Sequence, residues 1–424
     1  MKLLDFVFRQ NAKTFSVGIL LIGAIFWAFG WSKPHDAYPR TQFWVDSANC
    51  AKKTGHFLIV CENAGGERPI EDISLADDRG HVLILSAVSI ILNIDPSLDV
   101  LRLVNVAINL IGFLLLTIVL QLRVGWRSGA IAALIGAYWL GARAGPDVDA
   151  AYIGIAAMSA AAMILAAGRV SVTTAIGVLL LLSATSIIRQ PVGFGASISL
   201  ILLAITSFYL VRSTTLRRYS TLAALLLIAT FSIMAPSMPT AIRNAVLHTK
   251  PTGIAAHGLS HNLFLGLGGY VDNKWKIVWD DTYAQNLMKQ LHPEIAYCSD
   301  AYFKEIGKLY WRYVRDDPAE AARIYLVKAG RTFAAAEGLS VSALFSLVNI
   351  LGLLMFAKRK SRWPAPVRSM LLLGPVLFAL SFLAQGVLTH PAWTYIYPGP
   401  ILLMICVAIA FDISLKEKEL APPS

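Results

Sequence analysis

The chain has 424 residues, of which 56% are hydrophobic and 15% are charged, and its formal net charge is +11. Soluble domains average about 45–50% apolar and about 25% charged residues, so this composition excludes an ordinary soluble protein. It predicts an all-α polytopic membrane protein with the lipid bilayer, and no nucleic acid, among its partners.

Apolar runs close to the length of a transmembrane helix, about 20 residues, recur along the whole chain. The first run is too long for the core of a signal peptide and lacks a small-residue cleavage site, so it is predicted to remain as an anchor. Stronger and shorter runs together predict about ten spans. They cover 14–31, 99–121, 128–143, 150–168, 172–188, 193–211, 219–237, 341–357, 367–388 and 393–412.

Basic residues gather in the short connections between these runs, as at Arg123, Arg127 and Arg169, and near both ends of the chain. The positive-inside rule places them, and both termini, in the cytoplasm. This assignment requires that the segment 82–98 does not cross the membrane. Its apolar part is short for a span, so it is predicted to form a re-entrant or interfacial helix.

Two large polar segments then face outward and divide the chain. Residues 1–237 form an N-terminal transmembrane module with a first outer loop at 32–98, residues 238–340 form an outer segment, and 341–424 contain the last spans and a cytoplasmic tail. Helical periodicity marks the later part of the outer segment, with a second helix starting after Asp317. Cys50 and Cys61 share the first loop, where a disulfide and two free thiols are both compatible with the sequence.

Ionisable residues collect on the predicted outer side, whereas the spans are almost free of charge. This asymmetry argues against an ion-coupled transporter, which needs polar groups near the middle of the bilayer. It favours a site at the outer membrane boundary. The candidates are Asp46 in the loop after the first span, Asp77, Asp78, Arg79, His81, Asp147, Asp149, Arg189, Arg243, Lys250, His257 and His261.

A metal site is not predicted. His257 and His261 have the spacing of neighbours on a helix face, but Gly258 and Ser260 disfavour a zinc-binding helix there. No other ligand set is evident, so no cofactor is expected, although the sequence leaves a divalent metal open.

The order of short motifs resembles that of the GT-C superfamily of membrane glycosyltransferases, in the branch of protein O-mannosyltransferases and lipid A aminoarabinose transferases. An acidic motif follows the first span, then come a Gly-His dipeptide, an asparagine-containing helix and a second outer acid. An arginine before proline, an Arg-Asn exit and an Asn-Leu segment complete the series. The matching stretches are "FWVDSANCAKKTGHF", "RGHVLIL", "LRLVNVAINLIG", "PDVDAAY", "IIRQPVG", "MPTAIRN" and "HNLFLGLG".

The resemblance implies transfer of a sugar, with inversion, from a polyprenyl-phosphate donor to a glycan, lipid or protein acceptor outside a bacterial inner membrane. A carboxylate takes the proton of the acceptor hydroxyl, and basic side chains bind the departing phosphate. Asp46 is the expected base, with Asp147 or Asp149 orienting the sugar or acceptor. Arg189, Arg243 and Lys250 are the expected phosphate ligands. Asp77, Asp78, His81, His261 and Asn262 are the expected substrate-binding residues.

The chain departs from the family pattern at two places. Ser47 stands where the family often has a glutamate after the first aspartate, and no prolines follow His81. Two other functions remain as alternatives: a flippase or exporter of lipid-linked sugars, and a ligase or polymerase of surface polysaccharide. Neither requires a carboxylate in the first outer loop.

Overall fold

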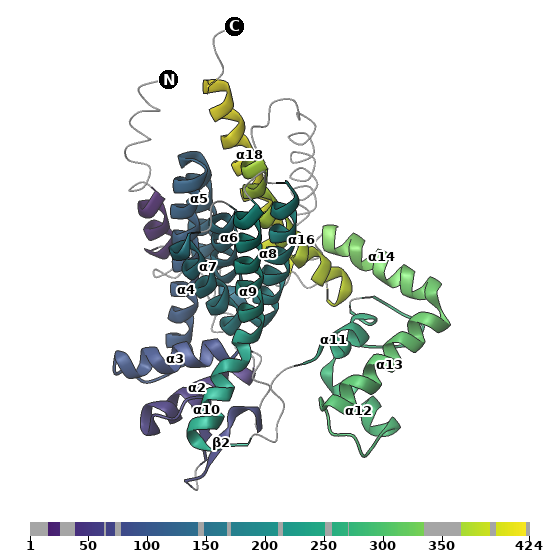
Figure 1. The fold of residues 1–424 in the computed structure, drawn as a ribbon. Coiled ribbons are helices and arrows are strands. Elements are labelled where there is room, and N and C mark those ends of the chain that lie inside the picture. Colours follow the sequence, from purple (N-terminus) through teal and green to yellow (C-terminus); the bar gives the residue numbers. More distant parts are fainter. Residues whose placement is uncertain are drawn as a thin grey trace.

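The computed structural model describes residues 16–25, 39–62, 65–72, 78–142, 148–167, 171–210, 215–250, 257–269, 271–334, 366–390 and 396–420. Nearly every element in these ranges is a helix, as the composition predicts, and their one sheet is a two-stranded hairpin. Long helices stand side by side in a bundle, smaller elements cap one end of it, and a second group of helices lies beside it (Figure 1).

The centre of the bundle is α6 (Tyr152–Ala166), whose side chains are buried on every face. Its alanines and glycine allow neighbouring backbones to approach closely, as in helix pairs within membranes. A Cβ on Gly112 would lie 2.1 Å from the carbonyl oxygen of Gly154, so this crossing requires glycine. The other bundle helices are α4 (Leu98–Arg123), α5 (Trp126–Ala142), α7 (Val172–Ile188), α8 (Gln190–Leu210), α9 (Thr215–Met234), α16 (Pro366–Leu388) and α18 (Pro398–Leu420).

Four helical stretches of the described residues are long and apolar enough to cross a membrane: Leu98–Arg123, Asp149–Ala166, Gln190–Tyr209 and Tyr219–Leu247. Further apolar helices, including Val172–Ile188, Leu372–Leu388 and Pro398–Ile413, are shorter. The predicted span at 341–357 lies outside the described residues. The structure thus supports a multi-helix apolar bundle, while the number of about ten spans stays a prediction.

Two short helices, α2 (Pro39–Thr54) and α3 (Arg79–Ile91), pack against each other across one end of the bundle (Figure 1). The expectation of a loop around Asp46 is wrong, because that residue lies within α2. The helix is stabilised by burial of one face: Trp44, Ala48 and Ala51, spaced four and three residues apart, are almost fully buried.

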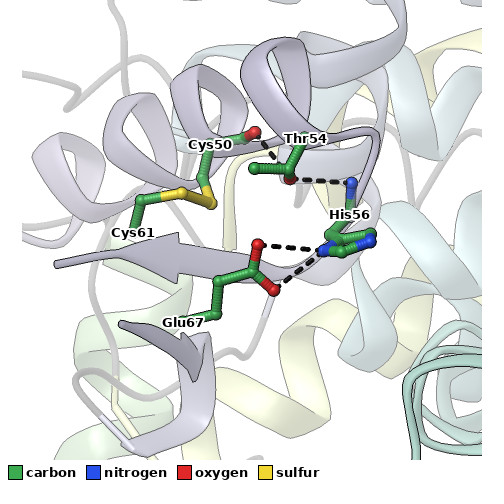
Figure 2. The surroundings of a disulfide bond; sticks show 5 residues. All are labelled: Cys50, Thr54, His56, Cys61 and Glu67. Carbon is green, nitrogen blue, oxygen red and sulfur yellow. Dashed lines mark hydrogen bonds and ion pairs between the residues drawn. A yellow bond between two sulfur atoms is a disulfide. The ribbon is translucent and has the colours of Figure 1, made fainter. Parts of the chain in front are cut away.

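A disulfide between Cys50 and Cys61 joins α2 to the hairpin of β1 (Ile59–Cys61) and β2 (Glu67–Pro69) (Figure 2). Of the two states that the sequence allows, the structure therefore shows the paired one. Figure 2 also shows the His56 ring turned toward Glu67, with Nδ1 2.8 Å from the carboxylate. These contacts make α2 and the hairpin one cross-linked unit.

The second group contains α11 (Leu259–Gly266), α12 (Asp281–Leu291), α13 (Asp300–Asp316) and α14 (Pro318–Ala334). Its own core is aromatic and includes Phe264, Tyr302 and Tyr310. The predicted helix start at Asp317 is confirmed, because its carboxylate accepts a hydrogen bond of 2.9 Å from the Glu320 amide.

Lys328 of α14 links this group to the bundle. Its buried amine donates hydrogen bonds to the carbonyl oxygens of Gly266, at the end of α11, and Thr389, after α16, at 2.8 and 2.7 Å. Burial lowers the pKa of Lys328 to about 7. Both the ammonium and the neutral amine carry N–H donors, so the bridge is compatible with either state.

Candidate functional site

The most deeply buried charged contact among the predicted residues joins the cap to the bundle. Asp78, just before α3, is fully buried, and its two carboxylate oxygens accept hydrogen bonds from Nη1 of Arg189 at 2.7 and 2.8 Å. Arg189 ends α7 and is 4% exposed. Arg189 and Asp78, which come from two different motifs of the predicted series, are therefore partners although they lie 111 residues apart in the sequence.

Glycine is required where α3 meets α7. A Cβ on Gly80 would lie 2.6 Å from both the carbonyl oxygen of Ile187 and the Cα of Ile188. These are backbone atoms next to Arg189, so they cannot turn aside as a flexible side chain would. Gly80 thus sets the depth at which Asp78 reaches the guanidinium.

We expect Gly80→Ala to push α3 away from α7, lower the free energy of unfolding by about 1–3 kcal/mol and reduce activity. Gly177→Ala is the matched control, since it lies within α7 with no atom within 4 Å of the added Cβ. That substitution should be neutral or mildly stabilising. Thermal unfolding of both variants in detergent measures the difference, and equal melting temperatures would contradict the role given to Gly80.

His81 occupies the next position of α3 and is fully buried. Its Nε2 lies 2.9 Å from Oδ1 of Asn105 in α4, and its ring centroid lies 5.9 Å from that of Trp44 in α2. Burial lowers the pKa of His81, and this effect outweighs the opposing influence of Asp78. A neutral His81 therefore connects α2, α3 and α4 beside the Asp78–Arg189 pair.

Asp149 lies on the other side of Arg189, with Oδ1 4.0 Å from Nη2. Asn109 of α4 fixes this turn: its amide donates to the Ala150 carbonyl oxygen at 2.6 Å, and its Oδ1 accepts from the Gly154 amide at 2.8 Å. The Arg189 guanidinium carbon also lies 5.4 Å from the centroid of the Tyr152 ring. Two acids from segments far apart in the sequence thus flank one arginine.

Asp46 has a different environment. Its Oδ1 accepts a hydrogen bond of 3.0 Å from Gln42, one turn earlier in α2. Two residues correspond to about 200° around a helix, so Asp46 lies opposite Trp44, the side chain that approaches His81. The half-buried Asp46 side chain thus lies on the side of α2 away from Trp44.

Arg243 lies in α10 (Met238–Leu247) and is 5% exposed. Its Nη1 donates to Oε2 of the buried Glu71 at 2.6 Å and to the Leu58 carbonyl oxygen at 2.9 Å. Its Nε and Nη2 donate to Oδ1 of Asn244. Arg243 therefore anchors the segment that contains Leu58 and Glu71 to α10. Lys250, three residues beyond that helix, is exposed.

His261 and Asn262 lie on α11, in the second helical group. The buried His261 ring contacts Tyr302 and Asp281, and the Asn262 amide donates to the Gly258 carbonyl oxygen at 3.4 Å. His257 precedes α11, so the two histidines do not share a helix face, in keeping with the glycine between them. The predicted substrate-binding residues thus divide between the cap and this group.

Asp77 and Asp147 lie outside the described residues. Asn105, Asn109 and Glu71 were absent from the predicted site, yet each holds a site residue in place. The asparagines carry a usable signal, because polar side chains within an apolar span are costly unless they have a partner. Glu71 has no such local signal.

Comparisons with known proteins agree with the fold. No protein-family model and no curated protein matches the sequence. The structure resembles the archaeal oligosaccharyltransferase AglB from Archaeoglobus fulgidus, in complex with an inhibitory peptide and a dolichol-phosphate, with a TM-score of 0.51 and 10% identity over 98% of this chain and 53% of AglB. It also has similarity to ArnT from Cupriavidus metallidurans in the apo state, with a TM-score of 0.37 and 12% identity over 94% of this chain and 76% of ArnT.

The chain spans about half the length of AglB, since 53% of AglB is covered. At this identity the likeness shows a shared fold, and that fold agrees with the one that the motif resemblance predicts.

Proposed function

We propose that this protein is a membrane glycosyltransferase that moves a sugar from a polyprenyl-phosphate donor to an acceptor at the outer membrane surface. The observation that carries the proposal is the group formed by Asp78, Arg189 and Asp149, which lies where the cap meets the apolar bundle. The fold shared with AglB, whose structure holds a dolichol-phosphate, supports a lipid phosphate as the ligand of this region.

Arg189 is the proposed phosphate ligand. Asp78 engages Nη1 and fixes the guanidinium plane, while Nη2 faces Asp149. A departing phosphate gains most from a rigidly held cation in a site of low dielectric. In this arrangement the donor phosphate approaches the Nη2 edge, and Asp149 orients a sugar hydroxyl.

Asp46 is the proposed general base. Its half-buried carboxylate bonds to Gln42 through Oδ1, which leaves Oδ2 for the hydroxyl of an acceptor. An acceptor hydroxyl becomes a nucleophile as its proton passes to such a carboxylate, and the phosphate leaves with the bonding electrons of the C–O bond.

Arg243 has a positioning role in this proposal rather than a phosphate contact. Its Nε, Nη1 and Nη2 all donate to Glu71, Leu58 or Asn244. A phosphate would have to displace the buried Glu71 carboxylate, which would then lose its partner. Arg243 instead keeps the first outer loop, and with it α2, against α10.

The proposed localisation is a bacterial inner membrane, with the cap outside and both termini in the cytoplasm. The Cys50–Cys61 disulfide favours an oxidising outer compartment for the cap. The helix α4 has 26 residues, about 39 Å at 1.5 Å per residue, so it carries the chain from the cap to the opposite end of the bundle.

Cysteine labelling tests this topology. We expect Asp95→Cys, whose native side chain is 94% exposed just before α4, to react with an impermeant reagent added outside intact cells. Arg123→Cys, at the far end of α4, should react only after the membrane is opened. The unsubstituted chain is the control, since Cys298 and Cys406 are buried. Labelling of Arg123→Cys from outside intact cells would contradict the proposed orientation of α4.

The activity is tested with purified protein, a radiolabelled polyprenyl-phosphate sugar and membranes as the acceptor source. We expect free polyprenyl phosphate to appear together with labelled acceptor. A flippase would move the donor without consuming it. Donor that stays intact under these conditions would contradict the transferase proposal.

A further inference from the structure

Three potential metal ligands converge in the second helical group, outside the Asp78–Arg189 site. His257 precedes α11, His261 lies in its first turn, and Asp281 is the first residue of α12. One donor atom from each of the three lies within 4.8 Å of the others. The structure therefore brings together ligands that the sequence places about two dozen residues apart.

The two imidazole rings present the same side to the carboxylate. They stack with centroids 4.4 Å apart and planes inclined by 8°. Nε2 of His261 lies 2.9 Å from Oδ1 of Asp281, and Nε2 of His257 lies 3.6 Å from Oδ2. Both Nε2 atoms thus face one carboxylate, with a separate oxygen opposite each ring.

The surroundings of His261 suit a ligand. The ring is fully buried, and its Nδ1 lies 2.7 Å from the hydroxyl of Tyr302 on α13. A hydroxyl can donate or accept, and it can therefore hold the ring whether Nδ1 is bare or protonated. Metal-ligating histidines commonly have such an outer partner, which fixes the ring orientation.

We propose that His257 Nε2, His261 Nε2 and the Asp281 carboxylate bind a divalent transition-metal ion of the zinc class. Imidazole nitrogens favour such ions over Ca²⁺ and Mg²⁺, which prefer oxygen ligands. Tetrahedral ligand bonds of about 2.0–2.2 Å place the donor atoms about 3.3–3.6 Å apart, close to the separations of 2.9 and 3.6 Å between the imidazole nitrogens and the carboxylate. The bond between His261 and Asp281 is then replaced by bonds to the ion, as is the 3.1 Å contact of His257 Nε2 with Tyr297.

Three protein ligands leave the fourth tetrahedral position for water or a substrate oxygen. The Asp281 side chain is 56% exposed and the His257 side chain 13% exposed, so the site opens to solvent on the Asp281 side. The ion would tie the start of α11 to the start of α12, independently of the transferase function.

The test uses the full-length protein in detergent with an affinity tag that contains no histidine. After treatment with a chelator, the protein is dialysed against Zn²⁺ and its metal content is measured. The wild type should retain one equivalent of zinc more than His257→Gln or Asp281→Asn. Co²⁺ should give the visible absorption of a tetrahedral site in the wild type alone, and Mg²⁺ should not compete.

Asp300→Asn is the matched control. Asp300 is the first residue of α13 after a capping residue, just as Asp281 is the first residue of α12, so both substitutions remove the same interaction with a helix dipole. Zinc binding should raise the melting temperature of the wild type, because the ion binds only the folded state. The Asp300→Asn variant should bind zinc as the wild type does and show the same rise. A wild type without stoichiometric zinc, or ligand variants that retain it, would overturn the proposal.

Discussion

Asp46→Asn should lower turnover by about 10²–10⁴-fold while leaving the KM for the donor nearly unchanged. The amide keeps the size of the side chain and a hydrogen-bonding oxygen, but it cannot take the proton of an acceptor hydroxyl. Because Asp46 is half-buried and its carboxylate bonds to Gln42 of the same helix, the fold should tolerate the change. The measurement is the rate of polyprenyl phosphate release at saturating donor, together with the melting temperature.

Asp149→Asn tests whether Asp149 or Asp46 is the general base. Asp149 faces the Arg189 edge that is assigned to the donor phosphate, so removing its charge relieves repulsion of that phosphate. Donor affinity should be kept or increased while turnover falls, because the sugar loses an orienting contact. If Asp46→Asn keeps full activity and Asp149→Asn abolishes it, the base belongs to the second outer loop. Ser47 is fully buried, so Ser47→Glu would bury a charged side chain and should lower the melting temperature.

Arg189→Ala should have the largest effect on folding. It leaves Asp78 fully buried without its cation, and breaking a buried pair in this way typically costs about 3–5 kcal/mol. Loss of activity in this variant alone would therefore not distinguish phosphate binding from unfolding. The double variant Asp78→Asn with Arg189→Gln removes both charges and leaves two neutral groups that can bond to each other.

We expect the double variant to recover most of the melting temperature but little of the turnover, because the proposed phosphate ligand is gone. The matched pair is Glu71→Gln with Arg243→Gln, which removes the other buried ion pair of the cap. That double variant should recover both stability and activity, since Arg243 only positions the outer loop. If the double variant that lacks Arg189 keeps full turnover, Arg189 is not the phosphate ligand. If the variant that lacks Arg243 is well folded but inactive, the phosphate role belongs to Arg243.

Local patterns predicted much of the fold. Apolar runs gave the bundle helices, and the segment predicted not to cross the membrane overlaps α3, which lies across the end of the bundle (Figure 1). The helix around Asp46 was missed because α2 is polar and is stabilised by burial of Trp44 against α3, a contact that its own sequence does not encode. Tertiary packing overrides weak local preference in such segments.

The candidate site was predicted as a set of residues but not as a set of partners. Order along the chain indicated Asp78, Arg189 and Asp149, whose separation in sequence hides their contact. Arg243 shows the limit of that reasoning: its position at a helix exit suggested an anion, and the structure supplies one from the protein itself, Glu71. The histidines were judged as a helical pair, whereas their third partner, Asp281, comes from another helix.

Both buried ion pairs of the cap also order events during synthesis. In each, the acid belongs to the first outer loop and its arginine follows much later, 111 residues on for Asp78 and 172 residues on for Glu71. In the proposed topology, a nascent chain exports both carboxylates before α7 and α10, which carry their arginines, have been made. In that topology the cap can form its disulfide before it docks, and a chain stalled before residue 243 exposes an unfinished site.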